Sequence, residues 1–231
     1  YKRQTSISGE ADWGYIRYGK QHRLERSLKI IEKHIDFNLT KNILDIGSNR
    51  GFFLNHLARS YGNLNLVGVE PDKVIVKETK HLSGINVFNG KIEDYDSNGQ
   101  IFDFIHSSHT FEHMTSASKG FDIAHKLLKN GGFFYLELPK TEAIKDEKII
   151  TEYFIDNHLF HFTKEILLGF INKYSYEIIY EDNNDPINHV YILNKNDGII
   201  RVLKLFDENN FTRRRDMVLN YWRTTSNNIR S

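Results

Sequence analysis

Residues 42–53 read NILDIGSNRGFF, and this stretch decides the fold. The apolar run 42–46 ends at Gly47 and a helical pattern starts at Phe52, so a buried strand passes through a glycine turn into a helix. Gly47 and Gly51 let the backbone turn tightly and approach a ligand closely. The helix that follows presents free N–H groups at its start. The stretch therefore predicts a ligand site at the carboxyl end of a strand in an open α/β sheet.

The same alternation of apolar runs and helical patterns continues along the chain. The expected strands are 42–46, 64–69, 85–88, 102–106, 133–138, 176–180 and 190–193. The expected helices are 23–35, 52–61, 74–82, 121–128 and 163–171, the last with Thr163 as its N-cap. This alternation predicts a mostly parallel sheet with helices on both faces. Too few residues join the last two strands for a helical crossover, so they must pair as a hairpin with one strand antiparallel.

Composition narrows the class of protein. The 231 residues are 39% hydrophobic and 13% aromatic, which suits one large domain with a real core. The net charge of +1 gives no electrostatic case for a nucleic-acid partner. No apolar run approaches the roughly 20 residues of a membrane span. The absence of cysteine excludes disulfides and thiolate chemistry. No signal peptide is recognisable, and we expect a cytoplasmic protein.

Two acidic residues stand where a nucleoside ligand would need them. Glu70 closes the second expected strand about twenty residues after the glycine turn, as in dinucleotide-type sites, and can accept two hydrogen bonds from a ribose diol. Asp45 lies inside an otherwise apolar strand, and a buried charge needs a partner, so we favour a functional role over simple capping of backbone N–H groups. A nicotinamide cofactor is the rival ligand, but the turn offers only Gly47 and Gly51 of its G-x-G-x-x-G fingerprint.

Over most of residues 40–195 the chain resembles the class I S-adenosylmethionine-dependent methyltransferases. The similar segments are LDIGSNRGFF, LVGVEPD, GKIEDYD, FDFIHSSHTFEHM, LLKNGGFFYLELP and HLFHFTKEILLGFI. The last of these is common in small-molecule and sugar methyltransferases. Two positions depart from the family pattern. Asn49 replaces the middle glycine of the first motif, although Asn tolerates a positive φ, and Lys91 stands where many members have an adenine-binding Asp.

The resemblance implies a doubly wound, seven-stranded sheet of order 3-2-1-4-5-7-6 with the last strand antiparallel. It implies S-adenosylmethionine as cofactor and S-adenosylhomocysteine as product. The donor-binding residues that it suggests are Asp45, Gly47, Ser48, Asn49, Gly51, Phe52, Glu70, Pro71, Ile92, Glu93, Ser107 and Tyr18. We expect residues 1–36 to form an N-terminal cap or lid, 37–196 the methyltransferase domain, and 197–231 a helical extension packed on that domain.

The reacting centre should lie past the fourth strand, where histidines gather. A hydroxyl acceptor must lose a proton, and histidine is the natural base near neutral pH. His109 is the first candidate for that base, and His158 and His161 could act as a base and an acceptor clamp. A metal site formed by His109, His158 and His161 is the less favoured alternative, because distant histidines rarely converge by chance, and we expect no metal.

The expected acceptor rests on a weaker similarity, to enzymes that modify glycans. We expect a hydroxyl of a small molecule or saccharide, including precursors of bacterial capsule or surface polysaccharide and their phosphorylated forms. The alternatives are methylation of nitrogen or of a phenol or quinone-like acceptor, and a donor-binding module without catalysis. The pattern is compatible with a monomer or a homodimer.

Overall fold

The computed structural model describes residues 17–18, 21–141 and 158–196. Its strands are β1 (Arg17–Tyr18), β2 (Gln21–His22), β3 (Asn42–Ile46), β4 (Asn65–Glu70), β5 (Ile85–Asn89), β6 (Phe102–Ser108), β7 (Leu128–Pro139), β8 (Tyr176–Glu181) and β9 (Asn188–Lys195). Its helices are α1 (Arg23–His34), α2 (Phe52–Ser60), α3 (Lys73–Thr79), α4 (Ala117–Leu127) and α6 (Lys164–Lys173), with short 3-10 turns η3 (Ile92–Asp94) and η4 (Phe111–His113).

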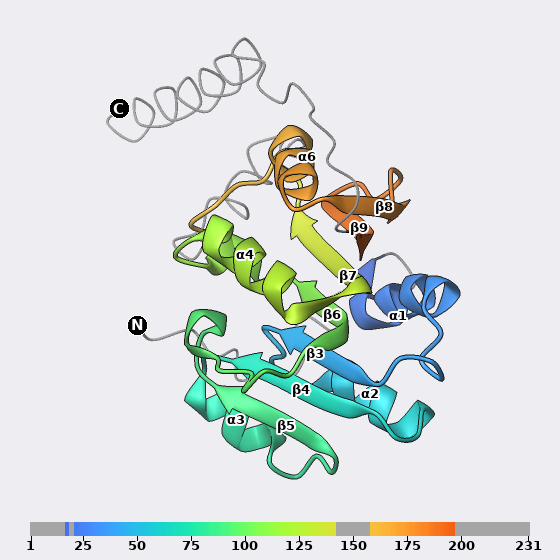
Figure 1. Ribbon diagram of the computed structural model, residues 1–231, viewed down its shortest axis with the longest axis vertical. Coiled ribbons are helices and arrows are strands. Elements are labelled where there is room, and N and C mark those ends of the chain that lie inside the picture. Colours follow the sequence, from blue (N-terminus) through green and yellow to red (C-terminus); the bar gives the residue numbers. More distant parts are fainter. Residues whose placement is uncertain (1–16, 19–20, 142–157, 197–231) are drawn as a thin grey trace, which may run out of the picture. The chain divides into compact units, whose positions relative to one another are not determined.

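The main sheet has seven strands in the order β5-β4-β3-β6-β7-β9-β8 (Figure 1). Numbered from β3 as the first strand, this order is 3-2-1-4-5-7-6, and the prediction is confirmed. β3, β4, β5, β6 and β7 pair in parallel, whereas β9 is antiparallel to both β7 and β8. The order reverses between β4 and β6 at β3, which puts the glycine turn at the switch point where such sheets bind ligands.

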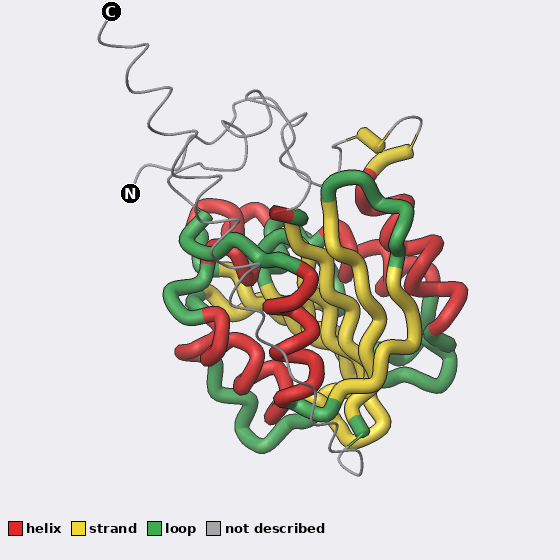
Figure 2. Tube along the Cα trace, turned by 90° about the horizontal axis from the view of Figure 1, so that it is seen from above, coloured by secondary structure: helices red, strands yellow, loops and turns green. Residues whose placement is uncertain are grey.

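Helices cover both faces of this sheet (Figure 2). α1 and α2 bury Leu28, Ile31 and Leu57 against one face, in a cluster that includes Phe104. α4 and α6 bury residues such as Phe121 and Leu167 against the other. Both faces of the sheet are therefore covered, which explains why β3 has apolar side chains on both sides, Leu44 and Ile46 in one cluster and Ile43 in the other.

Most predicted helix bounds hold to within two residues; α3 ends at Thr79 rather than at residue 82, and the larger difference is in α4. It begins at Ala117 rather than at residue 121, because the Ser116 side chain caps its first turn by accepting from Lys119 N. β7 also begins earlier than predicted, at Leu128 rather than at residue 133. The Asn-Gly-Gly segment before residue 133 was read as a stop, but it lies inside the strand, where Gly131 takes a φ of 77°.

In the expected cap of residues 1–36, α1 packs on a face of the sheet through Leu28 and Ile31, because its apolar stripe needs an apolar partner. Its Arg23 and Ser27 side chains reach Glu137 near the carboxyl end of β7. Residues 1–16 and 197–231 lie outside the described residues, so the lid and the C-terminal extension stay predictions. Tyr18 lies in β1, which pairs with β2. Within the described part of the chain, no helix is long and apolar enough to cross a membrane.

Candidate donor and acceptor site

The turn after β3 is held in a left-handed backbone at three of its five residues. Gly47, Asn49 and Gly51 have φ values of 79°, 48° and 71°. Asn49 adopts the left-handed conformation that a middle glycine would allow, and its Oδ1 accepts from Arg50 N at 2.8 Å. The departure from the family pattern at Asn49 therefore leaves the turn intact.

Gly47 has a second, steric reason to be glycine. A Cβ atom at this position would overlap the side chain of Thr110. Thr110 Oγ1 donates to the carbonyl of Ile46 at 3.1 Å, so the segment after β6 packs directly on the glycine turn. Sequence spacing did not indicate Thr110, because its partner lies 64 residues away.

Glu70 lies at the end of β4 and is only 3% exposed. Its Oε2 accepts from Asn49 N at 3.0 Å and its Oε1 from Asp72 N at 2.9 Å. These two amides fix the orientation of the carboxylate beside the glycine turn. A carboxylate has roughly four acceptor positions, so this arrangement is compatible with binding a ribose diol as well.

The buried carboxylate of Asp45 pairs with a side chain of the protein itself. Its Oδ1 lies 2.7 Å from Nδ1 of His106, its register neighbour on β6, and both side chains are buried. The His106 ring stacks between Phe53 and Tyr135, at centroid distances of 4.0 and 5.2 Å. Direct contact of Asp45 with the cofactor stays a prediction, and the buried charge has a physical explanation without it.

The other expected donor-binding residues come from several different elements. Ile92 and Glu93 lie in η3 after β5, with Ile92 buried and Glu93 accepting from Thr115 Oγ1 at 3.4 Å. Ser107 is buried, and its hydroxyl donates to the Ile46 carbonyl at 3.1 Å, so its side chain ties β6 to β3. The remaining members are Ser48, which is buried, Phe52 at the start of α2, and exposed Pro71.

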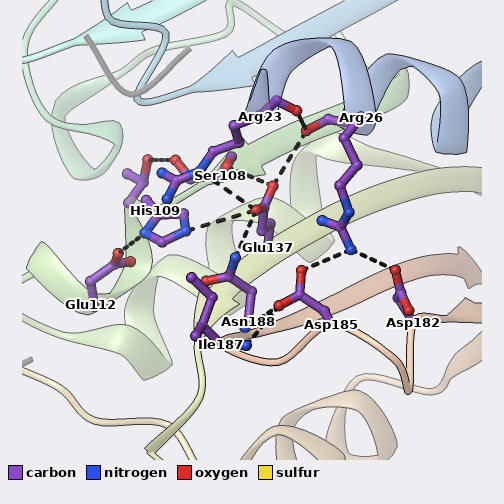
Figure 3. A network of polar contacts seen from close by, with 12 residues as sticks. Arg23, Arg26, Ser108, His109, Glu112, Glu137, Asp182, Asp185, Ile187 and Asn188 are labelled. Carbon is purple, nitrogen blue, oxygen red and sulfur yellow. Dashed lines mark hydrogen bonds and ion pairs between the residues drawn. The ribbon is translucent and has the colours of Figure 1, made fainter. Parts of the chain in front are cut away.

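His109 lies just past β6 between two buried glutamates (Figure 3). Its Nδ1 is 3.3 Å from Glu112 Oε1, and its Nε2 is 3.8 Å from Glu137 Oε1. The Nε2 atom is buried. Both ring nitrogens thus face carboxylates of the protein rather than an open site.

The other acceptor-side histidines gather around Glu112. The amides of Leu159 and Phe160 donate to the Glu112 carbonyl at 2.8 and 3.1 Å, which brings the segment beginning at His158 against η4. The ring of His158 lies 4.9 Å from that of His113 and 6.3 Å from that of His161. The structure therefore brings together residues that the sequence separates by more than forty positions.

Burial and charge act on this cluster in opposite directions. Burial alone would raise the pKa of the Glu112 carboxyl, but the neighbouring His109 and His113 imidazoles lower it below its ordinary value. Glu112 is therefore an anion at neutral pH. Burial lowers the pKa of His161, so its ring is neutral at pH 7, the form that can accept a proton.

Glu137, at the end of β7, is a residue that the sequence analysis missed. It is fully buried and accepts hydrogen bonds from Ser108 Oγ and Tyr135 Oη at 3.0 Å each and from Asn188 Nδ2 at 3.2 Å. Arg23 Nε of α1 lies 3.9 Å from it. Figure 3 shows how this network continues from Asn188, whose backbone N–H donates to Asp185, to Arg26, which pairs with both Asp185 and Asp182 in the segment between β8 and β9. The sequence contained a clue to Glu137, because this charged residue interrupts an apolar strand as Asp45 does, and a buried charge needs a partner.

A comparison with protein families decides the class. A family described as methyltransferase domain matches residues 13–181. The chain belongs to this family. Its strand order is that of the class I S-adenosylmethionine-dependent methyltransferases, and S-adenosylmethionine is the cofactor that membership of this family implies.

Individual relatives agree with this assignment. Over 120 residues the methyltransferase is 29% identical to carboxy-S-adenosyl-L-methionine synthase from Nautilia profundicola. That match covers 49% of this chain and 51% of the relative, so the chain spans about half the length of the curated relative it matches.

Solved structures share the fold at low identity. The YcgJ protein from Bacillus subtilis superposes with a TM-score of 0.62 at 14% identity, covering 75% of this chain and 100% of that one. The plantazolicin methyltransferase BpumL, in complex with a triazolic desmethylPZN analog and SAH, gives a TM-score of 0.58 at 13% identity, covering 74% and 81%.

Proposed function

We propose that this methyltransferase transfers the methyl group of S-adenosylmethionine to a hydroxyl oxygen of a small molecule or saccharide, such as a precursor of a bacterial capsule or surface polysaccharide. The observation that carries the proposal is the group of histidines at the carboxyl end of β6, next to the glycine turn. A hydroxyl needs a base when it becomes a nucleophile, and imidazole provides one at neutral pH. The sulfonium of the donor supplies the activated methyl group.

The protein's own residues divide the remaining work. Glu70 and the turn from Gly47 to Gly51 hold the donor, while the segment that begins at His158 presents its histidines to the acceptor. We assign the proton-accepting role to His161 or His158. His109, the first candidate from sequence, has both ring nitrogens directed at carboxylates, so we assign it a positioning role between Glu112 and Glu137.

The first test is an acceptor panel. The protein is incubated with S-adenosylmethionine carrying an isotopically labelled methyl group and with sugar phosphates, nucleotide sugars, catechols and amines. Mass spectrometry should find the label on oxygen of a saccharide or another hydroxyl compound. Transfer only to nitrogen would favour the amine alternative, and donor binding without transfer to any class would favour a non-catalytic module.

Replacing Glu70 with alanine should weaken S-adenosylmethionine binding about 100-fold, because the two hydrogen bonds expected from the ribose diol to this charged group would be lost. Isothermal titration calorimetry measures this directly. Glu78→Ala is the matched control, since Glu78 is a more exposed acid that pairs with Arg50. Equal donor affinity in wild type and Glu70→Ala would show that the ribose is bound elsewhere.

Replacing His161 with asparagine should lower turnover about 100-fold and leave donor affinity unchanged, because a general base contributes at least that factor. His158→Asn and His109→Asn are measured beside it on the acceptor that the panel identifies. A large loss in His109→Asn with normal turnover in the other two variants would return the role of base to His109.

A further inference from the structure

We propose that Glu112, His113 and His158 form a binding site for one divalent transition-metal ion. These three residues offer one carboxylate oxygen and two imidazole nitrogens, and the three atoms all lie within 4.8 Å of one another. No metal site is expected from the sequence, so this inference comes from the arrangement of the side chains. It does not depend on the identity of the acceptor.

The strongest reason for a metal site is the burial of the Glu112 carboxylate. Its side chain is 1% exposed. Both carboxylate oxygens are buried, and among residues 17–18, 21–141 and 158–196 neither accepts a hydrogen bond of good geometry. A buried carboxylate needs a cation or several donors to offset its lost hydration. The groups near its Oε1 are the rings of His109, at 3.3 Å, and His113, at 3.8 Å. A metal ion would bind this carboxylate directly and add positive charge to that of the two imidazoles.

The backbone holds the second histidine in place. Glu112 and His113 are adjacent in η4, whereas His158 comes from a segment far along the chain. The amides that follow His158 donate to the carbonyl of Glu112, so the main chains of the two segments are bonded directly. The centroids of the His113 and His158 rings lie 4.9 Å apart in an edge-to-face arrangement, so the two imidazoles are direct neighbours.

The distances suit a small ion after a modest adjustment. Zinc bonds to histidine nitrogen and carboxylate oxygen are about 2.0–2.2 Å long, so tetrahedral ligand atoms lie roughly 3.4 Å apart. Glu112 Oε1 and His113 Nε2 are already at 3.8 Å. Closing the widest gap, 4.8 Å at most, requires a shift of about 1.4 Å, which side-chain rotations of partly exposed histidines can provide.

The ligand set selects the class of ion. Two imidazoles with one carboxylate suit zinc, iron(II) and related ions, whereas magnesium and calcium prefer oxygen ligands alone. Three protein ligands leave a position open, as in catalytic zinc sites. A hydroxyl bound there would have a lowered pKa. With His158 engaged as a ligand, His161 would be the histidine left to receive the acceptor's proton.

The test is metal binding, read without any acceptor. Chelator-treated, tag-free protein is titrated with zinc chloride by calorimetry and with cobalt(II) by visible absorption. We expect one zinc ion per chain in the wild type. Glu112→Gln, His113→Asn and His158→Asn should each lower zinc affinity at least about 100-fold, because even the residues that merely support a ligand affect affinity 10- to 100-fold. His56→Asn is the matched control, since His56 also pairs with a glutamate, Glu32, on a more exposed surface.

The outcomes are separable from those of the acceptor panel. Unchanged zinc affinity in the His113 and His158 variants, or weak binding of several ions per chain, would show adventitious binding and overturn the proposal. Donor binding and circular dichroism confirm that each variant is folded. If Glu112→Gln does not fold, the two partly exposed histidines carry the test alone. Loss of methyl transfer with intact zinc binding would count against the proposed function only.

Discussion

Replacing Gly47 with alanine should destabilise the protein by about 3 kcal/mol and remove detectable binding of S-adenosylmethionine. The cost has two parts, roughly 1–2 kcal/mol for a side chain in the left-handed region and 1–3 kcal/mol for overpacking. Gly47 has a φ of 79°, and a Cβ there would overlap Thr110. Because the turn and the segment after β6 share this contact, relieving it would displace the backbone that faces the donor.

Chemical denaturation and calorimetric donor titration measure the two effects of Gly47→Ala. Gly62→Ala is the matched control, because a Cβ at Gly62 meets nothing within 4 Å and its φ lies outside the left-handed region. We expect the control to bind the donor normally. Normal stability and donor affinity in Gly47→Ala would mean that the turn relaxes freely and that its geometry does not define the donor site.

Replacing Glu137 with glutamine should destabilise the protein by about 3 kcal/mol, within the range found when one partner of a buried ion pair is removed. The substitution keeps the size of the side chain but removes the charge opposite Arg23. It also places an amide N–H₂ among groups that already donate, the hydroxyls of Ser108 and Tyr135. Burial and the Glu137 charge raise the pKa of Tyr135 well above its ordinary value, so this phenol stays a donor.

Urea unfolding at neutral pH measures the effect of Glu137→Gln. Glu25→Gln is its control, because Glu25 pairs with Lys29 on the exposed face of α1 and its loss should not be detectable. A stability of Glu137→Gln equal to that of the control would show that the network in Figure 3 is solvated and does not tie α1 to β7.

The sheet could be predicted from the sequence because its signals are local. Each strand is a short apolar run, and the turn after β3 combines Gly47 and Gly51 with an asparagine that accepts a positive φ. The hairpin of the last two strands could be predicted because the connection between them is too short for a helical crossover. The bounds of α4 and β7 were less accurate, because a cap at Ser116 and a glycine inside a strand override the simple pattern.

The site was only partly predictable, because its polar contacts are long-range. Glu137 collects donors from α1, β6, β7 and the start of β9, and no spacing rule brings Ser27, Ser108 and Asn188 to one carboxylate. The position of His109 past β6 was predictable, but the direction of its ring was not. That direction depends on Glu112 and Glu137, which lie on different elements.

The central claim is that the glycine turn and Glu70 form a site for S-adenosylmethionine. Calorimetric titration of the full chain with S-adenosylmethionine, S-adenosylhomocysteine and NAD tests it most directly. We expect binding of the first two ligands, with about one site per chain, and no binding of NAD. Binding of NAD alone, or of none of the three, would contradict it.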